Sequence, residues 1–338
     1  MRGRGSDPDR AGGLLIFFDL LAEFAAHARS PGVTAVAQRF GAPLGVAVRG
    51  RPGVGCSAVA AALAGSGVTM TADAACADMH VLVIAEALKP EERAQLRAGA
   101  EATMVVLNKA DLTGACPGGP LAAAERRAVE VATTVGVPVV PMIAHLATVA
   151  LDDEEIAALR ALVAAPADMT STDAFIQSDH PLSAELRLGL LERLDRFGLA
   201  HAVLALADGA TEPTVLQQLR TLSQVDRVAE CLAAVGAPVQ YRRVRAAVHE
   251  LRTLAAQSGD DRVDAFLNSD EVVVAVMAAA VDVVQACGLT VDRGDDADAH
   301  VRRAVHWRHY AHGPVDVTHR CCAADISRGS LRLLGRAR

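Results

Sequence analysis

Between residues 43 and 163 the chain alternates short apolar runs with stretches of helical periodicity, and this alternation constrains the fold more than any other feature. Unbroken apolar runs are typical of strands that are buried on both faces. When such strands alternate with helices, a parallel sheet covered by helices is expected. We expect strands at 44–48, 80–84, 103–107 and 137–143, and helices at 57–63, 90–100, 121–135 and 152–163.

The strand signals end after about Asp168. Helical periodicity then appears at 183–197, 212–234, 239–257 and 261–287, with Gly198, Gly236 and Gly288 placed as C-terminal caps. The sequence therefore predicts an α/β class fold in three segments. These are an N-terminal tail and helix over 1–42, an α/β domain over 43–167, and an all-helical domain over 168–338.

Composition narrows the class of protein. Apolar residues make up 51% of the chain, which is enough for a globular core, and the net charge of −7 argues against nucleic-acid binding. The seven cysteines form no CxxC pair, which favours a reduced, cytoplasmic protein. The apolar run at 272–281 is too short to cross a bilayer and is read as a buried helix, and the run after residue 13 as an amphipathic helix instead of a signal peptide.

A glycine-rich turn follows the first expected strand. It reads Gly50-Arg-Pro-Gly53-Val-Gly55-Cys56-Ser57 and precedes a helix. This matches a phosphate-binding P-loop, G-x-x-x-x-G-K-[ST], in its glycines, its final serine and its position. Backbone amides in such a loop can surround a phosphate, and Ser57 is placed to ligate Mg²⁺. The P-loop lysine is replaced by Cys56, so an ordinary βα turn remains an alternative.

A second motif follows the third expected strand. Asn108-Lys109-Ala-Asp111 matches the N-K-x-D pattern that recognises guanine. Lys109 is one of two lysines in this chain, and the other is Lys89. A carboxylate at Asp111 can accept two hydrogen bonds from the guanine edge, a pair of donors that adenine lacks. The Lys109 stem would pack along the base, and Asn108 would tie this turn to the glycine-rich turn. A simple capped turn is the alternative.

These motifs resemble a known family. Residues 43–163 look like the G domain of dynamin-like and Era-like bacterial GTPases of the TRAFAC type, and the arginine-rich, lysine-poor composition looks actinobacterial. The stretch at 77–84, Lys89 with its neighbours, and 105–112 follow that family's run from fourth strand to base motif. Pro138 to Ala147 resembles the next strand and loop, with Ala144 at a base-contacting position. The resemblance implies GTP or GDP with Mg²⁺ as ligands, without making either obligatory.

The departures from that family concern catalysis. Cys56 replaces the lysine, Ile143 replaces a serine of the last loop, and the twelve residues between Gly65 and Asp78 cannot hold a switch loop and two strands. Asp73 is at best a remnant of the D-x-x-G motif. Because these elements sense the γ-phosphate and position water, weak or absent hydrolysis is expected, and no residue is assigned a catalytic role.

Three weaker features remain. Cys56 at a helix N-terminus could act as a nucleophile, although inert replacement is the favoured interpretation. A cluster near the C-terminus could hold a metal, but its spacing fits no zinc module. It consists of His300, His306, His309, His312, His319, Cys321 and Cys322. From Arg293 onward nine arginines outnumber five aspartates, so with Trp307 and Tyr310 this end could contact an anionic membrane or an acidic partner, a solvated face being the simpler interpretation.

Three functions therefore stay open. The first is a pseudo-GTPase that holds guanine nucleotide weakly and pairs with a related GTPase or with a second copy of itself. The second is an active dynamin-like GTPase that works at the inner membrane face and uses Arg49, Arg51 or a partner's arginine in place of the lysine. The third is a non-nucleotide interaction scaffold.

Overall fold

A computed structural model describes residues 13–98, 102–114 and 116–336. The chain forms two compact units, an α/β unit over residues 45–232 and a helical unit that combines the residues up to 44 with residues 233–338. These bounds differ from the three expected segments, since the α/β unit continues well past residue 167 and the N-terminal helices join the C-terminal ones. The predicted tail at 1–12 lies outside the described residues.

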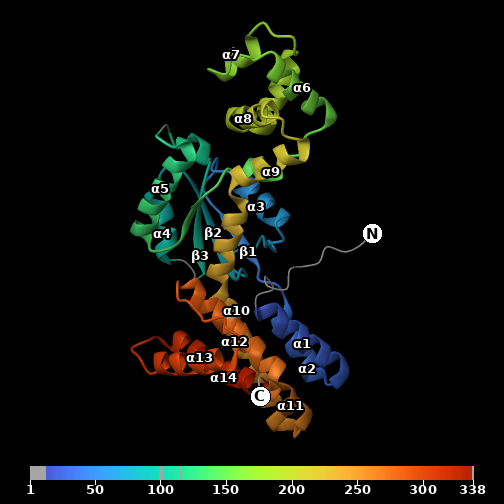
Figure 1. Cartoon of the computed structure of the whole chain (residues 1–338), viewed down its shortest axis with the longest axis vertical. Coiled ribbons are helices and arrows are strands. Elements are labelled where there is room, and N and C mark those ends of the chain that lie inside the picture. The colour runs from blue at the N-terminus through green and yellow to red at the C-terminus, as the bar shows by residue number, and fades with distance from the viewer. Residues whose placement is uncertain (1–12, 99–101, 115, 337–338) are drawn as a thin grey trace. The chain divides into compact units, whose positions relative to one another are not determined.

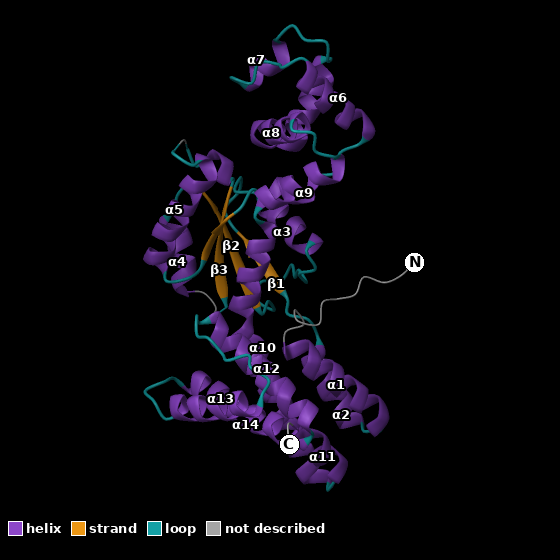
Figure 2. Cartoon of the chain, viewed as in Figure 1, coloured by secondary structure: helices purple, strands orange, loops and turns teal. Residues whose placement is uncertain are grey.

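The α/β unit is built on one parallel sheet, as the alternation predicted. Its strands are β1 (Val46–Arg49), β2 (Met79–Ala85), β3 (Thr103–Asn108) and β4 (Val139–Pro141), paired in that order (Figure 2, orange). Every residue of β2 and β3 is buried. A strand with no solvent-facing side must be apolar throughout, which is why these strands appear in the sequence as unbroken apolar runs.

Helices follow each strand of this unit. They are α3 (Cys56–Gly65), α4 (Pro90–Ala98), η2 (Ala110–Leu112), α5 (Gly119–Val135), η3 (Ala144–Thr148), α6 (Asp153–Ala164), α7 (Thr172–Gln177), α8 (Ala184–Ala207) and α9 (Glu212–Ser223). One apolar cluster joins Leu82 and Leu107 of the sheet to Ala128 of α5, Leu159 of α6 and Leu194 of α8. Helices α5 to α9 therefore belong to the sheet's own core.

The segment between α3 and β2 contains no strand. It touches the sheet at a single parallel bridge, Val46 with Met70, where Val46 N donates to Thr69 O over 2.9 Å and Thr71 N donates to Val46 O over 2.9 Å. The structure thus confirms that these residues do not hold the two strands that an intact domain of the suspected family would need.

The helical unit contains α1 (Gly13–Ala28), α2 (Pro31–Gly41), α11 (Asp261–Asn268), α12 (Asp270–Ala286), α13 (Ala297–Ala311), α14 (Val317–Arg336) and most of α10 (Val225–Ser258), which begins in the α/β unit (Figure 1). Its core includes Phe17, Tyr241, Val284, Trp307 and Ile326. The apolar run beginning at Val272 is a largely buried helix, as predicted.

Two glycines expected to end helices lie inside them instead. Gly236 is within α10, and Gly198 is within α8, whereas Gly288 does follow the end of α12. A Cβ on Gly198 would lie 2.6 Å from Leu146 Cδ2, so this glycine allows α8 and η3 to approach closely. The backbone of α8 breaks at Asp195, where φ is 56°.

The C-terminal stretch is more structured than its charge indicated. It forms α13 and α14, which the periodicity analysis did not include, and Trp307 is 1% exposed in the core. A buried tryptophan cannot serve as a membrane contact, so that part of the surface interpretation is wrong. Charged residues on the outer faces obscured the narrow apolar stripe that packs inward.

Candidate nucleotide-binding site

The glycine-rich loop from Gly50 to Ser57 connects β1 to α3. Gly53 and Gly55 have φ of 87° and 91°, and Gly55 is the N-cap of α3. Glycine has no side chain to cap the helix, so the N-cap gives the amides of the first turn no acceptor, and only the Cys56 thiol interacts with its own amide. Free amides at a positive helix end form an arrangement that favours an anion.

Asn108 connects this loop to two others. The side chain is buried at the end of β3, where Nδ2 donates to Val54 O over 2.8 Å and Oδ1 accepts from Ala144 N over 3.0 Å. The glycine-rich loop, the base motif and the loop after β4 therefore meet at the carboxyl ends of β1, β3 and β4, on the edge where parallel α/β sheets bind ligands. A Cβ on Gly55 would lie 2.4 Å from Asn108 Nδ2, so this junction requires glycine.

The other two members of the base motif follow directly. Lys109 has a left-handed φ of 57°, and Ala110 N donates to Met142 O over 3.1 Å, which holds the turn against β4. Asp111 then lies in η2 and is only partly exposed. Lys109, Asp111 and Ala144 are thus on loops attached to the same junction.

A break in α8 lies close to this carboxylate. Burial raises the pKa of Asp111, and the nearby Asp195 raises it further, while His145 and Lys109 oppose the change. The imidazole Nε2 of His145 is 3.3 Å from Leu194 O, which ties η3 to α8 beside the break. Sequence reasoning missed Asp195 and His145 because neither lies in a motif and only tertiary packing brings them near Asp111.

Cys56 supplies no positive charge. Its thiol is half-buried, and desolvation raises its pKa, so the neutral form is favoured. The sulfur turns back toward the start of the loop, since a Cβ on Gly50 would lie 2.8 Å from Cys56 Sγ. A nucleophilic cysteine needs a lowered pKa, so this geometry favours the inert replacement.

The two arginines considered as substitutes for the lysine have other neighbours. Arg51 Nε pairs with Glu92 Oε1 over 3.1 Å, and Arg51 Nη2 donates to Ala85 O over 3.0 Å. Glu92 is 2% exposed, so removing its partner would leave a buried charge. Arg49 lies near enough to His80 to lower the pKa of that imidazole, although burial of His80 is the larger cause. No motif or spacing in the sequence predicted the Arg51–Glu92 pair.

The switch remnant is an ordinary turn. The Asp73 carboxylate accepts from Ala75 N over 2.9 Å at the surface. Ser57 is exposed at the start of α3, and within the described residues no group of three or more His, Cys, Asp and Glu side chains could hold a metal ion. A Mg²⁺ ion would therefore have to be held by Ser57 together with nucleotide phosphates, which suits an ion that keeps few protein ligands.

The histidine-rich end of the chain has a structural explanation. Buried Arg303 donates through Nε to Ser330 Oγ over 2.9 Å and through Nη1 to Asp292 O over 2.8 Å. Its Nη2 is 2.6 Å from Nδ1 of His300, which is also buried. These contacts join α13 to α14 and to the preceding loop, so His300 of this cluster contributes to the packing of the helical unit.

No family model, curated protein or solved structure matches this chain significantly. Among the described helices, none is both long enough and apolar enough to span a membrane. The case for a nucleotide site therefore depends on the geometry of the three loops joined by Asn108.

Proposed function

We propose that this protein is a pseudo-GTPase, a degenerate G domain that binds GDP or GTP weakly and hydrolyses GTP little or not at all. The observation that carries the proposal is the Asn108 side chain, which bonds to both Val54 O and Ala144 N. This amide fixes a guanine-type motif against a glycine-rich loop at the N-terminus of α3. An ordinary βα turn does not require a buried side chain that bonds to two other loops.

Weak affinity follows from the missing lysine. A charge-assisted hydrogen bond contributes about 1.5–3 kcal/mol, so its loss lowers affinity by about 10- to 150-fold. The neutral Cys56 thiol cannot replace it, and Arg51 is held by Glu92 and Ala85. Backbone amides of Gly53, Gly55 and the first turn of α3 would then hold the phosphates without a cation from this chain.

The remaining residues of the site have distinct roles in this proposal. Asp111 would accept from the guanine edge, the Lys109 stem would cover the base, and the Ala144 amide, fixed by Asn108, would border it. Ser57 would contribute a ligand to Mg²⁺ when a nucleotide brings the ion. None of these residues activates water.

Absent hydrolysis follows from the segment between α3 and β2. GTPases need ordered residues beside the γ-phosphate to position water and respond to its loss. Here the segment makes one bridge to β1, and Asp73 lies in a surface turn. A domain that binds without turning over serves as a regulatory or structural subunit, so we propose a related active GTPase or a second copy as its partner, in the cytoplasm or at the inner membrane face.

A scaffold that binds no nucleotide is the second candidate, and one observation favours it. Asp111 is only partly exposed, and burial together with the nearby Asp195 raises the pKa of its carboxyl group. A carboxylate that reads a base needs to be ionised and open to the ligand. The burial of Asp111 therefore favours a fold in which this side chain has no base to bind.

Calorimetry and a hydrolysis assay test the proposal. Purified protein with Mg²⁺ should bind GDP weakly, should not bind ADP, and should release no phosphate from GTP above background. Asp111→Asn should remove GDP binding, whereas Asp73→Asn, at an exposed turn, should not. Phosphate release at rates typical of active GTPases, abolished by Asp111→Asn, would show instead that the protein is an enzyme.

A further inference from the structure

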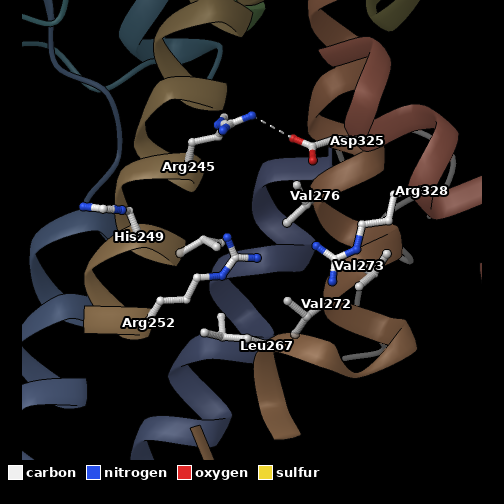
Figure 3. Close-up of a pocket in the computed structure, with 10 residues that line it drawn as sticks. Arg245, His249, Arg252, Leu267, Val272, Val273, Val276, Asp325 and Arg328 are labelled. Carbon is white, nitrogen blue, oxygen red and sulfur yellow. Dashed lines mark hydrogen bonds and ion pairs between the residues drawn. The ribbon is translucent and has the colours of Figure 1, made fainter. Parts of the chain in front are cut away.

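The helical unit contains a cavity of about 150 Å³ between α10, α11, α12 and α14 (Figure 3). None of its lining residues belongs to the motifs discussed above. They are Arg245, Val248, His249, Arg252, Leu267, Val272, Val273, Val276, Asp325 and Arg328. Three arginines thus face a cavity that has only one carboxylate in its wall.

That carboxylate already has partners. Asp325 Oδ2 accepts from the Tyr241 hydroxyl over 2.6 Å and lies 3.4 Å from Arg245 Nη1. The dashed line in Figure 3 marks the contact with Arg245 at one end of the cavity. Asp325 therefore balances Arg245, and the other two arginines are left without a close carboxylate in the wall.

Arg252 and Arg328 extend from different helices, and their guanidinium groups point toward one another across the cavity (Figure 3). Arg328 Nη2 donates to Asn268 Oδ1 over 3.2 Å, a neutral acceptor. Arg252 makes no side-chain hydrogen bond or ion pair with any residue that the structure describes, beyond a longer-range attraction to Asp325. Two converging positive charges repel one another, and an anion between them would remove that repulsion.

The rest of the lining is largely apolar. It includes Leu267, Val272 and Val273, which are buried, and Val276. Cavities of this volume with apolar linings hold molecules about the size of benzene. The site is therefore suited to a ligand with a charged end and a short apolar body.

We propose that this cavity binds an organic anion, a phosphate ester or carboxylate with an apolar group, through Arg252 and Arg328. Guanidinium groups form directional, charge-assisted bonds with phosphate and carboxylate oxygens. The apolar part of the ligand lies against α11 and α12. This site is independent of the nucleotide proposal, because all its residues lie in the helical unit.

Titration of the full chain with hexyl phosphate tests this site. We expect saturable binding by calorimetry, weaker binding of inorganic phosphate, and no binding of hexylammonium, which has the opposite charge. Arg252→Gln should weaken hexyl phosphate binding about tenfold without lowering the unfolding midpoint, since the side chain makes no hydrogen bond that folding depends on and its removal relieves the repulsion with Arg328. Arg328→Gln provides a second variant on another helix.

Arg308→Gln is the matched control, because Arg308 is exposed on α13 of the same unit and does not line the cavity. Vesicles with and without anionic phospholipid separate the two sources of the ligand. Anionic-vesicle binding that Arg252→Gln weakens identifies a lipid headgroup, and hexyl phosphate binding alone identifies a soluble ester. The proposal is overturned if hexyl phosphate does not bind at millimolar concentration, or if it binds Arg252→Gln and Arg328→Gln as tightly as the wild type.

Discussion

The glycine-rich loop of the α/β unit and the cavity of the helical unit differ in what each could offer an anion. The loop has backbone amides at a helix N-terminus, but its neighbouring side chain is the neutral Cys56. The cavity has Arg252 and Arg328 facing one another within a largely apolar lining, without a glycine loop. The loop therefore has backbone amides without a neighbouring cation, whereas the cavity has two guanidinium groups that extend from helices.

This difference teaches that the shape of a loop and its charge depend on different residues. The shape around Gly55 depends on steric fit and on two hydrogen bonds of Asn108, so it is maintained as part of the fold. A positive charge depends on a single side chain, and the residue that follows Gly55 is the neutral Cys56. A βα loop can therefore have the shape of an anion site without the charge of one.

The largest expected effect comes from Gly55→Ala, which tests whether the close packing of Gly55 against Asn108 is needed for folding. The new methyl group would meet Asn108 Nδ2, and the residue would have to keep a positive φ. We expect a loss of about 3 kcal/mol in the free energy of unfolding, measured by urea denaturation followed by circular dichroism. Gly53→Ala has a similar φ but open space around it, so it should cost only about 1 kcal/mol. Equal costs would contradict the steric account.

Asn108→Ala tests the hydrogen bonds that hold the glycine-rich loop in the same region. Removing the amide leaves Val54 O and Ala144 N without their partner inside the protein. The expected loss is about 2 kcal/mol in the free energy of unfolding, whereas Asn268→Ala, at an exposed position, should cost less than about 0.5 kcal/mol. A near-neutral Asn108→Ala variant would mean that the three loops are not held by this side chain.

Cys56→Lys tests whether charge alone is missing from the loop. A lysine there should tighten GDP binding about tenfold by calorimetry, because it adds one charge-assisted contact. Phosphate release from GTP should stay at background, since the switch segment is still absent. Cys76→Lys, which adds the same charge at an exposed turn, should leave GDP affinity unchanged. Restored turnover in Cys56→Lys would refute the structural argument about residues 66–78.

The smallest effect concerns the pH dependence of stability. Burial raises the pKa of Asp111 in the fold, so the ionised carboxylate opposes folding and this cost disappears as pH falls below its pKa. Asp111→Asn should therefore stabilise the protein at pH 7 by about 0.3 kcal/mol, a value reduced for solvent screening at a partly exposed group. The advantage should vanish near pH 3. A destabilised variant at pH 7 would contradict the inferred burial.

Local patterns predicted the sheet and the loops around it. Apolar runs located β2 and β3 because both strands are buried on both faces, and the glycine and N-K-x-D motifs placed the loops at their ends. The break of α8 at Asp195 lies two residues before the helix end that the sequence predicted at 197, although Asp195 itself carries no proline or glycine signal. Gly198 was misread as a cap because its purpose is contact with Leu146, distant in the sequence.

The boundary between the units was also beyond local reasoning. Helices α6 to α9 have the same charged periodicity as those of the helical unit, yet Leu159 and Leu194 pack into the core of the sheet. The Arg51–Glu92 pair joins a loop residue to a helix, and neither residue lies in a pattern that indicates the other. Pairings of this kind depend on tertiary structure.

A thermal-shift panel of guanine and adenine nucleotides tests the central claim most directly. Wild-type protein and Asp111→Asn would be heated with millimolar GDP or ADP, with and without Mg²⁺, because a ligand that binds only the folded state raises the midpoint by mass action. The account predicts that GDP raises the midpoint of the wild type, that ADP does not, and that Asp111→Asn loses the GDP effect. No shift with GDP, or equal shifts with GDP and ADP, would contradict it.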